Sequence, residues 1–397
     1  MRILHIIDTF GMGGAETWLV RLVKYAEASG EAFPKFDFLV TSGLESIFDI
    51  EMKEMGCEIF YLPLKKGKAL EFARELRALL KKNNYAAIHD HQDFLSGWHY
   101  LFALGLMPNV RVTHVHNPHY QLRNNYGTTL ARRTKLYLGR QLVKVYGTHI
   151  TGTSGRILEE YQITKSSNAR QDISVLNCAF ALENFKGVHS EEKLKLCKEL
   201  NWPLDSTIVL FAGRLDYSLN VDDKNNHKNS AFAVNVISAC KDSNVRMVMA
   251  GKNDFIINEF KQFIDDLGLS SRVVLLGVRE DISHLMLAAD VLLFPSRAEG
   301  MGMVAVEAQA AGLPVCASSA VPDEIVVIKE LVEFVSLEKS YLEWVTVLND
   351  LARRRRDFDT TADVRWQKSP FNIKVCWDRL KEIYSNGEVA SNIRKEE

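Results

Sequence analysis

The chain has 397 residues, of which 47% are hydrophobic and 25% are charged, and its formal net charge at pH 7 is −1. This composition is ordinary for a globular protein, and the length is sufficient for two domains. Because the net charge is close to zero, there is no overall bias toward nucleic acid, and we predict no nucleic-acid partner.

Three features of the sequence predict a cytoplasmic protein. The six cysteines are scattered and form no CxxC pair, which is typical of reduced thiols. No apolar run reaches the roughly 18 residues that a membrane-spanning helix needs. The N-terminus begins with a strand pattern and lacks the pattern of a signal peptide.

Strand and helix patterns alternate through the first half of the chain. An apolar run at 2–8 precedes a glycine-rich turn and a helix from about residue 17 to 29. Further strands are predicted at 36–41, 57–62, 86–91, 110–116 and 148–152, with helices at 69–82 and 94–105. This alternation predicts a doubly wound parallel sheet, in which ligands bind at the carboxyl ends of the strands.

The turn after the first strand, TFGMGGAET, matches the dinucleotide fingerprint GxGxxG only in part. Gly11 and Gly13 are in place, but Glu16 occupies the last position, which needs a small residue. The sequence therefore argues against a dehydrogenase. Gly13 and Gly14 are expected to let a substrate approach the backbone, and the alternative is a tight turn without a ligand.

Four histidines lie at the carboxyl ends of two predicted strands, namely His89, His91, His114 and His116. We assign His114 and His116 to opposite faces of their strand, which would prevent both rings from binding one metal ion. His89 and His91 admit a metal site, but we interpret them as cleft or packing residues and predict no bound metal. His116 lies at the strand tip and is our preferred cleft residue, with His114 as the alternative.

No Asp or Glu occurs between residues 94 and 158, although Arg and Lys are frequent there. Within this region, residues 128–146 are predicted to form a basic amphipathic helix. Three interpretations stay open: a contact with an anionic membrane surface, a site for a pyrophosphate-linked lipid acceptor, or a solvated face that docks on its own domain.

The second half opens on a buried strand at 207–213, followed by Arg214, a long polar loop, Lys228 and a helix from about residue 230. An Arg at a strand end and a Lys before the next helix form a cationic pair. Such a pair suits a nucleotide diphosphate leaving group, because the negative charge on that group rises as the bond breaks. Lys224 fits the same pattern, so the choice between the two lysines stays open.

Residues 290–316 predict a strand at 291–294, a turn, a helix at 303–311 and the start of another strand. The backbone N–H groups that begin this helix, near Gly302, favour the binding of a phosphate. Glu299 lies in the turn, and Glu307 lies about two helical turns further along, so both carboxylates can face one ligand.

These motifs resemble those of the retaining glycosyltransferases of family 4, and bacterial capsular and exopolysaccharide glycosyltransferases in particular. The resemblance rests on EGMGMVAVE between PS and GLPV, on the GGAE turn, and on Arg214 with Lys228-Asn229. It implies an α/β protein of the GT-B fold, with two Rossmann-like doubly wound domains facing a central cleft. The acceptor-side domain would span 1–190 and the nucleotide-sugar domain 191–370. A helix at 371–385 would cross back to the first domain, and 386–397 would be a disordered tail.

The resemblance also implies an activity. A sugar would move from a nucleotide sugar, most simply a UDP-sugar, to a glycan or lipid-linked acceptor in cell-surface polysaccharide synthesis, without a metal cofactor. His116 and Glu299 would contact the sugar, Arg214 and Lys228 the diphosphate, Glu307 the ribose and Val278 the base. The full donor-binding set comprises Gly13, Gly14, Arg214, Lys228, Val278, Gly300, Met301, Gly302, Met303, Val304 and Glu307. A non-catalytic GT-B subunit or a nucleotide-sugar epimerase is the alternative.

Overall fold

The structure is a computed structural model of the whole chain. It describes all residues except 12, 31–33, 120–128, 166–169, 224, 253–255, 356, 358–359, 361 and 394–397, and it describes side chains only as far as residue 385. The chain divides into two compact units. Unit 1 comprises Met1–Ala181 and Pro370–Glu397, and unit 2 comprises Leu182–Ser369.

Unit 1 is built on a seven-stranded parallel sheet with the order β3-β2-β1-β4-β5-β6-β7. The strands are β1 (Arg2–Ile7), β2 (Lys35–Val40), β3 (Glu58–Tyr61), β4 (Ala87–Asp90), β5 (Val110–Val115), β6 (His149–Gly152) and β7 (Asp172–Val175). The prediction of a doubly wound sheet is confirmed. The strand order reverses between β1 and β4, which makes this pair the topological switch point of the unit.

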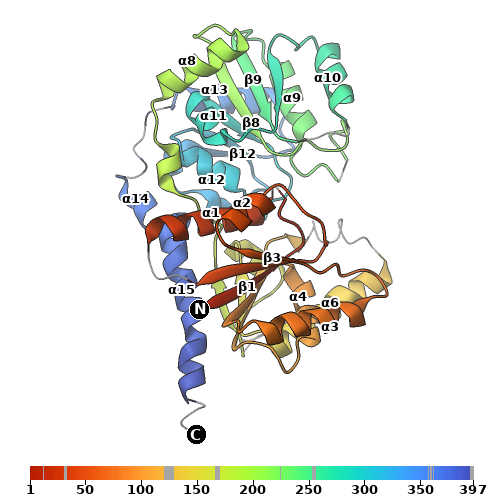
Figure 1. The fold of residues 1–397 in the computed structure, drawn as a ribbon. Helices are drawn as coiled ribbons and strands as arrows, with labels where there is room; N and C mark the ends of the chain where they lie inside the picture. Colours follow the sequence, from red (N-terminus) through yellow and green to blue (C-terminus); the bar gives the residue numbers. More distant parts are fainter. Residues whose placement is uncertain are drawn as a thin grey trace. The chain divides into compact units, whose positions relative to one another are not determined.

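Helices cover both faces of this sheet. They are α1 (Gly14–Ser29), α2 (Asp49–Glu54), α3 (Ala69–Lys82), the short η1 (Asp93–Leu95), α4 (Ser96–Phe102), α6 (Leu130–Tyr146), α7 (Gly155–Glu160) and α15 (Ile373–Ile393). Figure 1 shows α3, α4 and α6 on one side of the sheet and α1 on the other. The side with α3 buries an apolar cluster that includes Phe72, Leu76, Tyr100 and Val143.

The C-terminal helix α15 belongs to unit 1, where it contacts α1 and β5. Trp377, Leu380 and Tyr384 are each about 99% buried on it. We predicted that this helix ends near residue 385, but it continues to Ile393. Residues 386–393 contain no proline, and the single Gly387 costs only about 1 kcal/mol relative to Ala, so the helix can continue through it. Residues 394–397 of the predicted tail lie outside the described residues.

Unit 2 contains a six-stranded parallel sheet with the order β10-β9-β8-β11-β12-β13. Its strands are β8 (Thr207–Ala212), β9 (Val245–Ala250), β10 (Val273–Gly277), β11 (Val291–Phe294), β12 (Val315–Ser318) and β13 (Val332–Val335). The strand order reverses between β8 and β11. The central strands β8 and β11 are buried on both faces and are almost wholly apolar, as expected of a parallel sheet.

The helical segments of unit 2 are η2 (Leu182–Phe185), α8 (His189–Leu200), α9 (Ser230–Ala239), α10 (Ile257–Asp266), α11 (Ile282–Ala288), α12 (Met303–Ala310), η3 (Asp323–Ile325), η4 (Lys329–Leu331), α13 (Tyr341–Ala352) and α14 (Val364–Gln367). The core under α9, α10 and α13 is apolar and includes Phe232, Phe260 and Trp344. Within the part of the chain that the structure describes, no helix combines the length and the hydropathy needed to cross a membrane.

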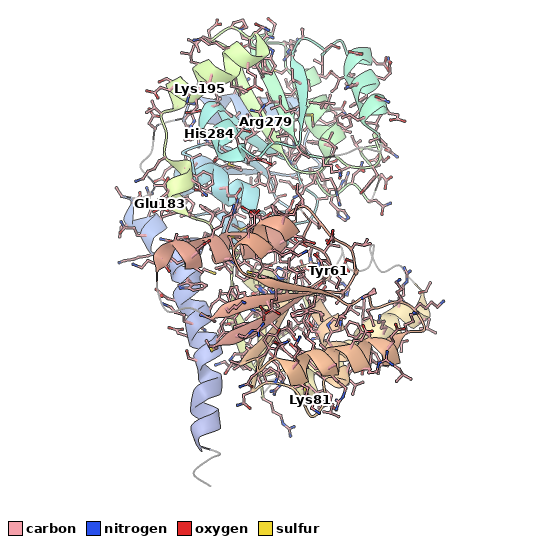
Figure 2. All side chains as sticks on the ribbon, in the orientation of Figure 1. Tyr61, Lys81, Glu183, Lys195, Arg279 and His284 are labelled. Atoms are coloured by element: carbon pink, nitrogen blue, oxygen red, sulfur yellow. The ribbon has the colours of Figure 1, made fainter. Side chains whose placement is uncertain are left out.

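Ion pairs join α8 to α11 and to the segment that precedes it. Arg279, which precedes α11, contacts Glu199 at 2.5 Å, and His284 of α11 contacts Glu192 at 3.2 Å. Within α8, Glu192 also contacts Lys195 at 2.7 Å. Figure 2 labels Lys195, Arg279 and His284 on this side of unit 2. Each pair includes one side chain that is at least 45% exposed, so the pairs contribute little to the stability of the unit.

Candidate active site

The predicted donor-site residues of unit 2 gather at its topological switch point. The loop after β8 carries Arg214 and Lys228, and the loop after β11 carries Glu299. β8 and β11 are hydrogen-bonded neighbours, so both loops leave the sheet at the same edge. Ligands of open α/β sheets bind at this position, outside the carboxyl ends of the strands where the order reverses.

Glycines shape the strand ends beside this position. The N–H of Gly213 donates to the carbonyl of Ala250 at 2.9 Å, and that of Gly251 donates to the carbonyl of Gly277 at 2.7 Å. A Cβ atom on Gly251 would lie 1.9 Å from the carbonyl oxygen of Gly213, and its φ is 154°. Only glycine therefore allows the loops after β8 and β9 to pass this closely.

A buried carboxylate holds Lys228 in place. Asp216 is 5% exposed. Its Oδ1 accepts the backbone N–H of Lys228 at 3.0 Å, and its Oδ2 accepts the backbone N–H of Ser230 at 2.8 Å. The intervening Asn229 adopts a left-handed conformation with φ of 59°. Asp216 thus ties the end of β8 to the start of α9 and fixes the backbone from which Lys228 extends.

Lys228 forms an ion pair with Glu299, with 2.6 Å between Nζ and Oε1. The two side chains are 26% and 12% exposed, so the pair is shielded yet reachable from solvent. The Nζ atom also lies 5.6 Å from the centre of the Phe294 ring. A second link joins the same two loops, because the N–H of Arg297 donates to the carbonyl of His227 at 2.8 Å.

Arg214 lies in the same loop but points to solvent. It is exposed, and its guanidinium lies 5.5 Å from the centre of the Tyr217 ring. Among the described residues, no carboxylate forms an ion pair with Arg214. The other lysine considered from the sequence, Lys224, lies outside the described residues. The structure therefore brings Lys228 together with Glu299, and it leaves the positive charge of Arg214 available to an anionic ligand.

The turn after β11 leads into the N-terminus of α12. Gly302 is the residue before the helix and has φ of 93°, which favours glycine. Gly300 and Met301 form the turn, Met301 being buried, and Met303 and Val304 are the first two helical residues. The N–H of Ala305 already donates to the carbonyl of Gly302 at 2.9 Å. The N–H groups of Met303 and Val304, which begin the helix, have no partner within it and are available to an anion.

Glu307 lies in the second turn of α12 and is 7% exposed. Its neighbour Gln309 is fully paired: its amide group donates to the carbonyl of Ile325 at 2.8 Å and accepts the N–H of Ile328 at 2.9 Å. Gln309 thereby holds the segment after β12 against α12. Val278 follows β10 at the edge of the sheet and is 43% exposed.

Gly13 and Gly14 lie at the start of α1, next to the switch point of unit 1. Gly13 is the residue before the helix, and a Cβ atom on it would meet the carboxylate of Glu16 at 2.1 Å. The Glu16 side chain thus folds back over the turn. Burial, together with the nearby Asp8, raises the pKa of Glu16 to about 7.

The predicted orientation of the histidines on β5 is wrong. The rings of His114 and His116 are 4.0 Å apart and lie on the same face of the sheet, because residues two apart in a strand share a face. His5 and His91 lie on this face as well, with 3.0 Å between His5 Nδ1 and His91 Nε2. His114 is fully buried, whereas His116 at the strand tip is half-buried.

Asp93 supports the tip of β5, a role that our sequence analysis missed. Its Oδ1 accepts the N–H of His116 at 2.8 Å, and its Oδ2 accepts the side-chain N–H of Asn117 at 2.8 Å. Asp93 is buried and has φ of 49°. Burial raises its pKa to about 6. Asp93 and Asp216 share one signal that the sequence contained: each is an acidic residue within four positions of the end of a buried strand.

Solved structures with the same architecture identify the fold. HepE from Anabaena has a TM-score of 0.75 to this chain at 18% identity, and the match covers 97% of this chain and 99% of HepE. WaaG, a glycosyltransferase involved in lipopolysaccharide biosynthesis, has a TM-score of 0.65 at 16% identity and 98% coverage of this chain. Both units of the chain are therefore Rossmann-like domains of the GT-B fold.

Sequence comparison then narrows the class. Residues 206–336 match the model for glycosyl transferases group 1. The putative glycosyltransferase EpsF of Bacillus subtilis is 28% identical over 366 residues, which cover 90% of each chain. The capsular polysaccharide biosynthesis glycosyltransferase CapH of Staphylococcus aureus is 22% identical, covering 97% of this chain and 98% of CapH. The chain is thus a glycosyltransferase enzyme, and its residues 206–336 form a glycosyl transferases group 1 domain.

Proposed function

We propose that this enzyme is a retaining glycosyltransferase that moves a sugar from a UDP-sugar to a glycan or lipid-linked acceptor in cell-surface polysaccharide synthesis. The proposal rests first on the Lys228–Glu299 pair at the switch point of the group 1 domain. Two comparisons support it: solved structures of HepE hold UDP or UDP-glucose, and CapH carries capsular polysaccharide biosynthesis in its name.

The donor would be bound through its diphosphate. Lys228 and Arg214 would neutralise the charge that grows on the leaving diphosphate, and the N–H groups at the start of α12 would add a favourable dipole. Glu307, which is buried in α12, would accept hydrogen bonds from the ribose, and the backbone at Val278 would meet the base. Gly13 and Gly14 would let the donor phosphates or the acceptor approach the backbone of unit 1. Because these side chains supply the positive charge, we propose that no metal ion is needed.

The transfer itself would proceed on one face of the sugar. As the bond between the anomeric carbon and the phosphate oxygen breaks, the acceptor oxygen bonds to the same carbon from the same side. The leaving phosphate oxygen takes the proton of the acceptor hydroxyl, so no protein nucleophile is required. Glu299 would orient the sugar ring once the diphosphate competes for Lys228, and His116 would contact the sugar near its 6-position.

The acceptor is proposed to be presented at the inner face of the cell membrane, with α6 as the contact. Leu130, Tyr137 and Val145 on this helix are 81%, 63% and 61% exposed, and Arg133 and Lys135 are exposed beside them. Apolar and basic side chains together favour an anionic bilayer surface. Part of the basic face is docked, since Arg140 donates to the carbonyl of Tyr161 and lies 5.5 Å from the centre of the Phe94 ring. All six cysteines are free and buried, which suits a reducing compartment.

A donor screen tests the enzymatic proposal. UDP-sugars are expected to raise the unfolding temperature, because they bind only the folded chain. Lys228→Met and Arg214→Ala should each lower UDP affinity by about tenfold or more, as expected for a lost charged hydrogen bond. Lys241→Met, which removes an exposed lysine outside the site, should leave the affinity unchanged. Activity with EDTA present should persist, and NMR of the product should show the anomeric configuration of the donor.

Three results would contradict the proposal: no stabilisation by any nucleotide sugar, product of inverted configuration, or epimerised donor without transfer. The membrane contact is tested separately by flotation with vesicles that contain anionic lipid. Replacement of Leu130 and Val145 by Gln should reduce binding, whereas Leu342→Gln, at a position 61% exposed on α13, should not. Equal binding of all variants would exclude α6 as the contact.

A further inference from the structure

Five histidines of unit 1 form an array on one face of its sheet. His5 lies on β1, His114 lies on β5, His89 lies on β4, and His91 and His116 directly follow β4 and β5. Four of them are less than 10% exposed, and His116 is half-buried. This face is covered by Trp18 of α1 and by Tyr384 of α15. The ring nitrogens of the array contact one another in two separate chains.

The direction of hydrogen-bond donation along the first chain, which joins Tyr384, His89 and His114, is set by the group that His114 contacts. The Nε2 atom of His114 lies 3.0 Å from the carbonyl oxygen of Leu176, which can only accept, so Nε2 carries the proton. Burial holds the pKa values of His89 and His114 well below the ordinary value, so both rings are neutral. The bare Nδ1 of His114 then accepts from Nε2–H of His89 at 3.2 Å, and Nδ1 of His89 accepts from the hydroxyl of Tyr384 at 2.6 Å.

The second chain runs from His5 through His91 to His116. His5 Nδ1 and His91 Nε2 are 3.0 Å apart, and so are His91 Nδ1 and His116 Nε2. In both pairs the ring centres are 5.3 Å apart. These two separations together require the contacting nitrogens to lie on the line between the rings, which is the geometry of a linear N–H···N hydrogen bond.

Hydrogen bonds along this chain could be donated in either direction, and the buried ring of His5 at one end distinguishes the two possibilities. The Nε2 atom of His5 is buried and has no hydrogen-bond partner among the described residues. If it carried the proton, a buried N–H group would stay unpaired, which is rare in proteins, whereas an unpaired acceptor costs less. His5 therefore carries its proton on Nδ1 and donates to His91, and His91 donates to His116. The remaining proton of His116 is on Nδ1, the nitrogen outside the chain.

Metal binding is an alternative interpretation of the same nitrogens. Ring nitrogens lie within 4.8 Å of one another in two groups of three histidines, which are His5, His89 and His91, and His91, His114 and His116. Metal ligands direct their lone pairs at one common point about 2 Å from each nitrogen. Here each contact is instead a pair of nitrogens directed at each other. The array also contains no carboxylate that would offset a buried double positive charge. Hydrogen bonding explains the geometry, and metal binding does not.

We propose that His5 and His91 are positioning residues that hold His116 in the tautomer with its proton on Nδ1. His116 then offers an N–H donor, and no basic lone pair, to the oxygen of its ligand. The identification of this ligand as a sugar hydroxyl rests on the proposed function, whereas the assignment of the tautomer does not. Asp93 completes the arrangement, because it holds the backbone N–H of His116 at 2.8 Å while His91 holds the ring. The assignment makes His116 a hydrogen-bond donor and excludes it as a general base.

The tautomer can be measured without substrate, on the full chain labelled with ¹⁵N-histidine. Two-bond ¹H–¹⁵N NMR spectra distinguish protons on Nδ1 from protons on Nε2, and the signal of His116 is identified by its loss in His116→Phe. The wild type should show the Nδ1–H form. His5→Asn should preserve it, because the side-chain amide of Asn can donate in place of Nδ1–H. His5→Phe removes the donor and should change the tautomer ratio of His116 by about tenfold.

Tyr384→Phe is the matched control, since it removes a donor from the first chain and should leave the tautomer of His116 unchanged. An Nε2–H form of His116 in the wild type, assigned with His116→Phe, would overturn the proposal even if neither His5 variant folds. The same holds for a tautomer that His5→Phe does not alter, and for stoichiometric Zn²⁺ bound by the folded chain. Nucleotide-sugar binding is measured separately. A wrong tautomer would therefore not contradict the proposed function, and the absence of nucleotide-sugar binding would not contradict the tautomer assignment.

Discussion

Because the histidine array is buried, we predict that unit 1 loses stability in mild acid. Substitution of His5 tests the contribution of one histidine to this loss. His5 is fully buried between aromatic rings, with ring centres 4.4 Å from Phe36 and 5.4 Å from Phe38. Burial lowers its pKa from 6.5 to about 3. His5→Phe suits this environment, because it removes the titrating group and keeps an aromatic ring among aromatic neighbours.

The magnitude follows from the two pKa values of His5. In the unfolded chain the ring takes up a proton below pH 6.5, whereas in the folded chain it stays neutral until about pH 3. The stability that His5 contributes is therefore complete above pH 6.5 and is lost as the pH falls toward 3. Each pH unit in that window is worth about 1.4 kcal/mol, so the loss between pH 7.5 and pH 5 is about 2 kcal/mol.

Other groups of unit 1 titrate in the same range, so the prediction concerns the difference between wild type and variant. Asp93 acts in the opposite direction: its pKa is raised to about 6, so its folded form gains stability as the pH falls through 6. His89 and His91 lose stability in acid as His5 does, because burial lowers their pKa values too. The contribution of Asp93 is common to both proteins and is removed by subtraction. His89 and His91 lie beside His5, whose charge helps to lower their pKa values, so the variant should also lose less stability in acid through these two rings.

Hydrogen exchange at pH 7.5 and pH 5 is the suitable assay, since peptides from β1, β4 and β5 report on unit 1 and peptides from β8 provide an internal control. At pH 7.5 the variant should be less stable by about 1 kcal/mol, the value of one hydrogen bond. At pH 5 that deficit should disappear or reverse, because the wild type has lost about 2 kcal/mol more. A difference between the two proteins that is the same at both pH values would refute the reasoning.

Three further predictions concern unit 2 and the thiols. Gly251→Ala should lower the free energy of unfolding by about 3 kcal/mol, because its Cβ atom would lie 1.9 Å from the carbonyl oxygen of Gly213; urea unfolding measures this. Asp216→Asn should cost about 2 kcal/mol of stability and weaken UDP binding, since it removes a charged acceptor from the N–H of Lys228; calorimetry with UDP checks the second effect. The six cysteines, all buried, should react with a thiol reagent only after the chain unfolds, as followed by mass spectrometry.

Matched variants separate these effects from general disruption. Gly268→Ala introduces a Cβ atom at a positive φ of 67° in open space, so it should cost only the backbone strain of about 1 kcal/mol. An equal cost at Gly251 would mean that the contact with Gly213 relaxes freely. Asp222→Asn changes an exposed carboxylate in the same loop as Asp216 and should alter neither stability nor UDP binding. Rapid labelling of any cysteine in the folded chain would contradict its burial.

Local patterns in the sequence were sufficient for the elements and for part of the candidate site. The helix at 69–82 was predicted with the bounds that α3 has in the structure, because its apolar residues recur with the helical period. The turn at 299–302 was recognisable for a similar reason: strand, glycines and helix are consecutive in the chain. Every contact that such a turn needs lies within a few residues, and local sequence encodes it.

Contacts between distant segments could not be predicted in this way. Lys228 meets Glu299 across 71 residues, and His5 meets His91 across 86. Both pairs depend on the order of the strands, which brings β8 beside β11 and β1 beside β4. The pattern along one strand contains no information about its neighbour in the sheet. Asp216 was missed for this reason, because its partners become visible only when the loop after β8 closes on α9.

The sequence by itself determined that this chain is a two-domain α/β protein with a group 1 glycosyltransferase signature, since hydrophobic periodicity and short motifs are properties of consecutive residues. Only the tertiary structure decided that five histidines share one face and form two hydrogen-bonded chains. It alone also paired Lys228 with Glu299. The physical reason is the same in both cases: strand pairing sets which side chains meet, and burial then sets whether they carry charge or exchange hydrogen bonds.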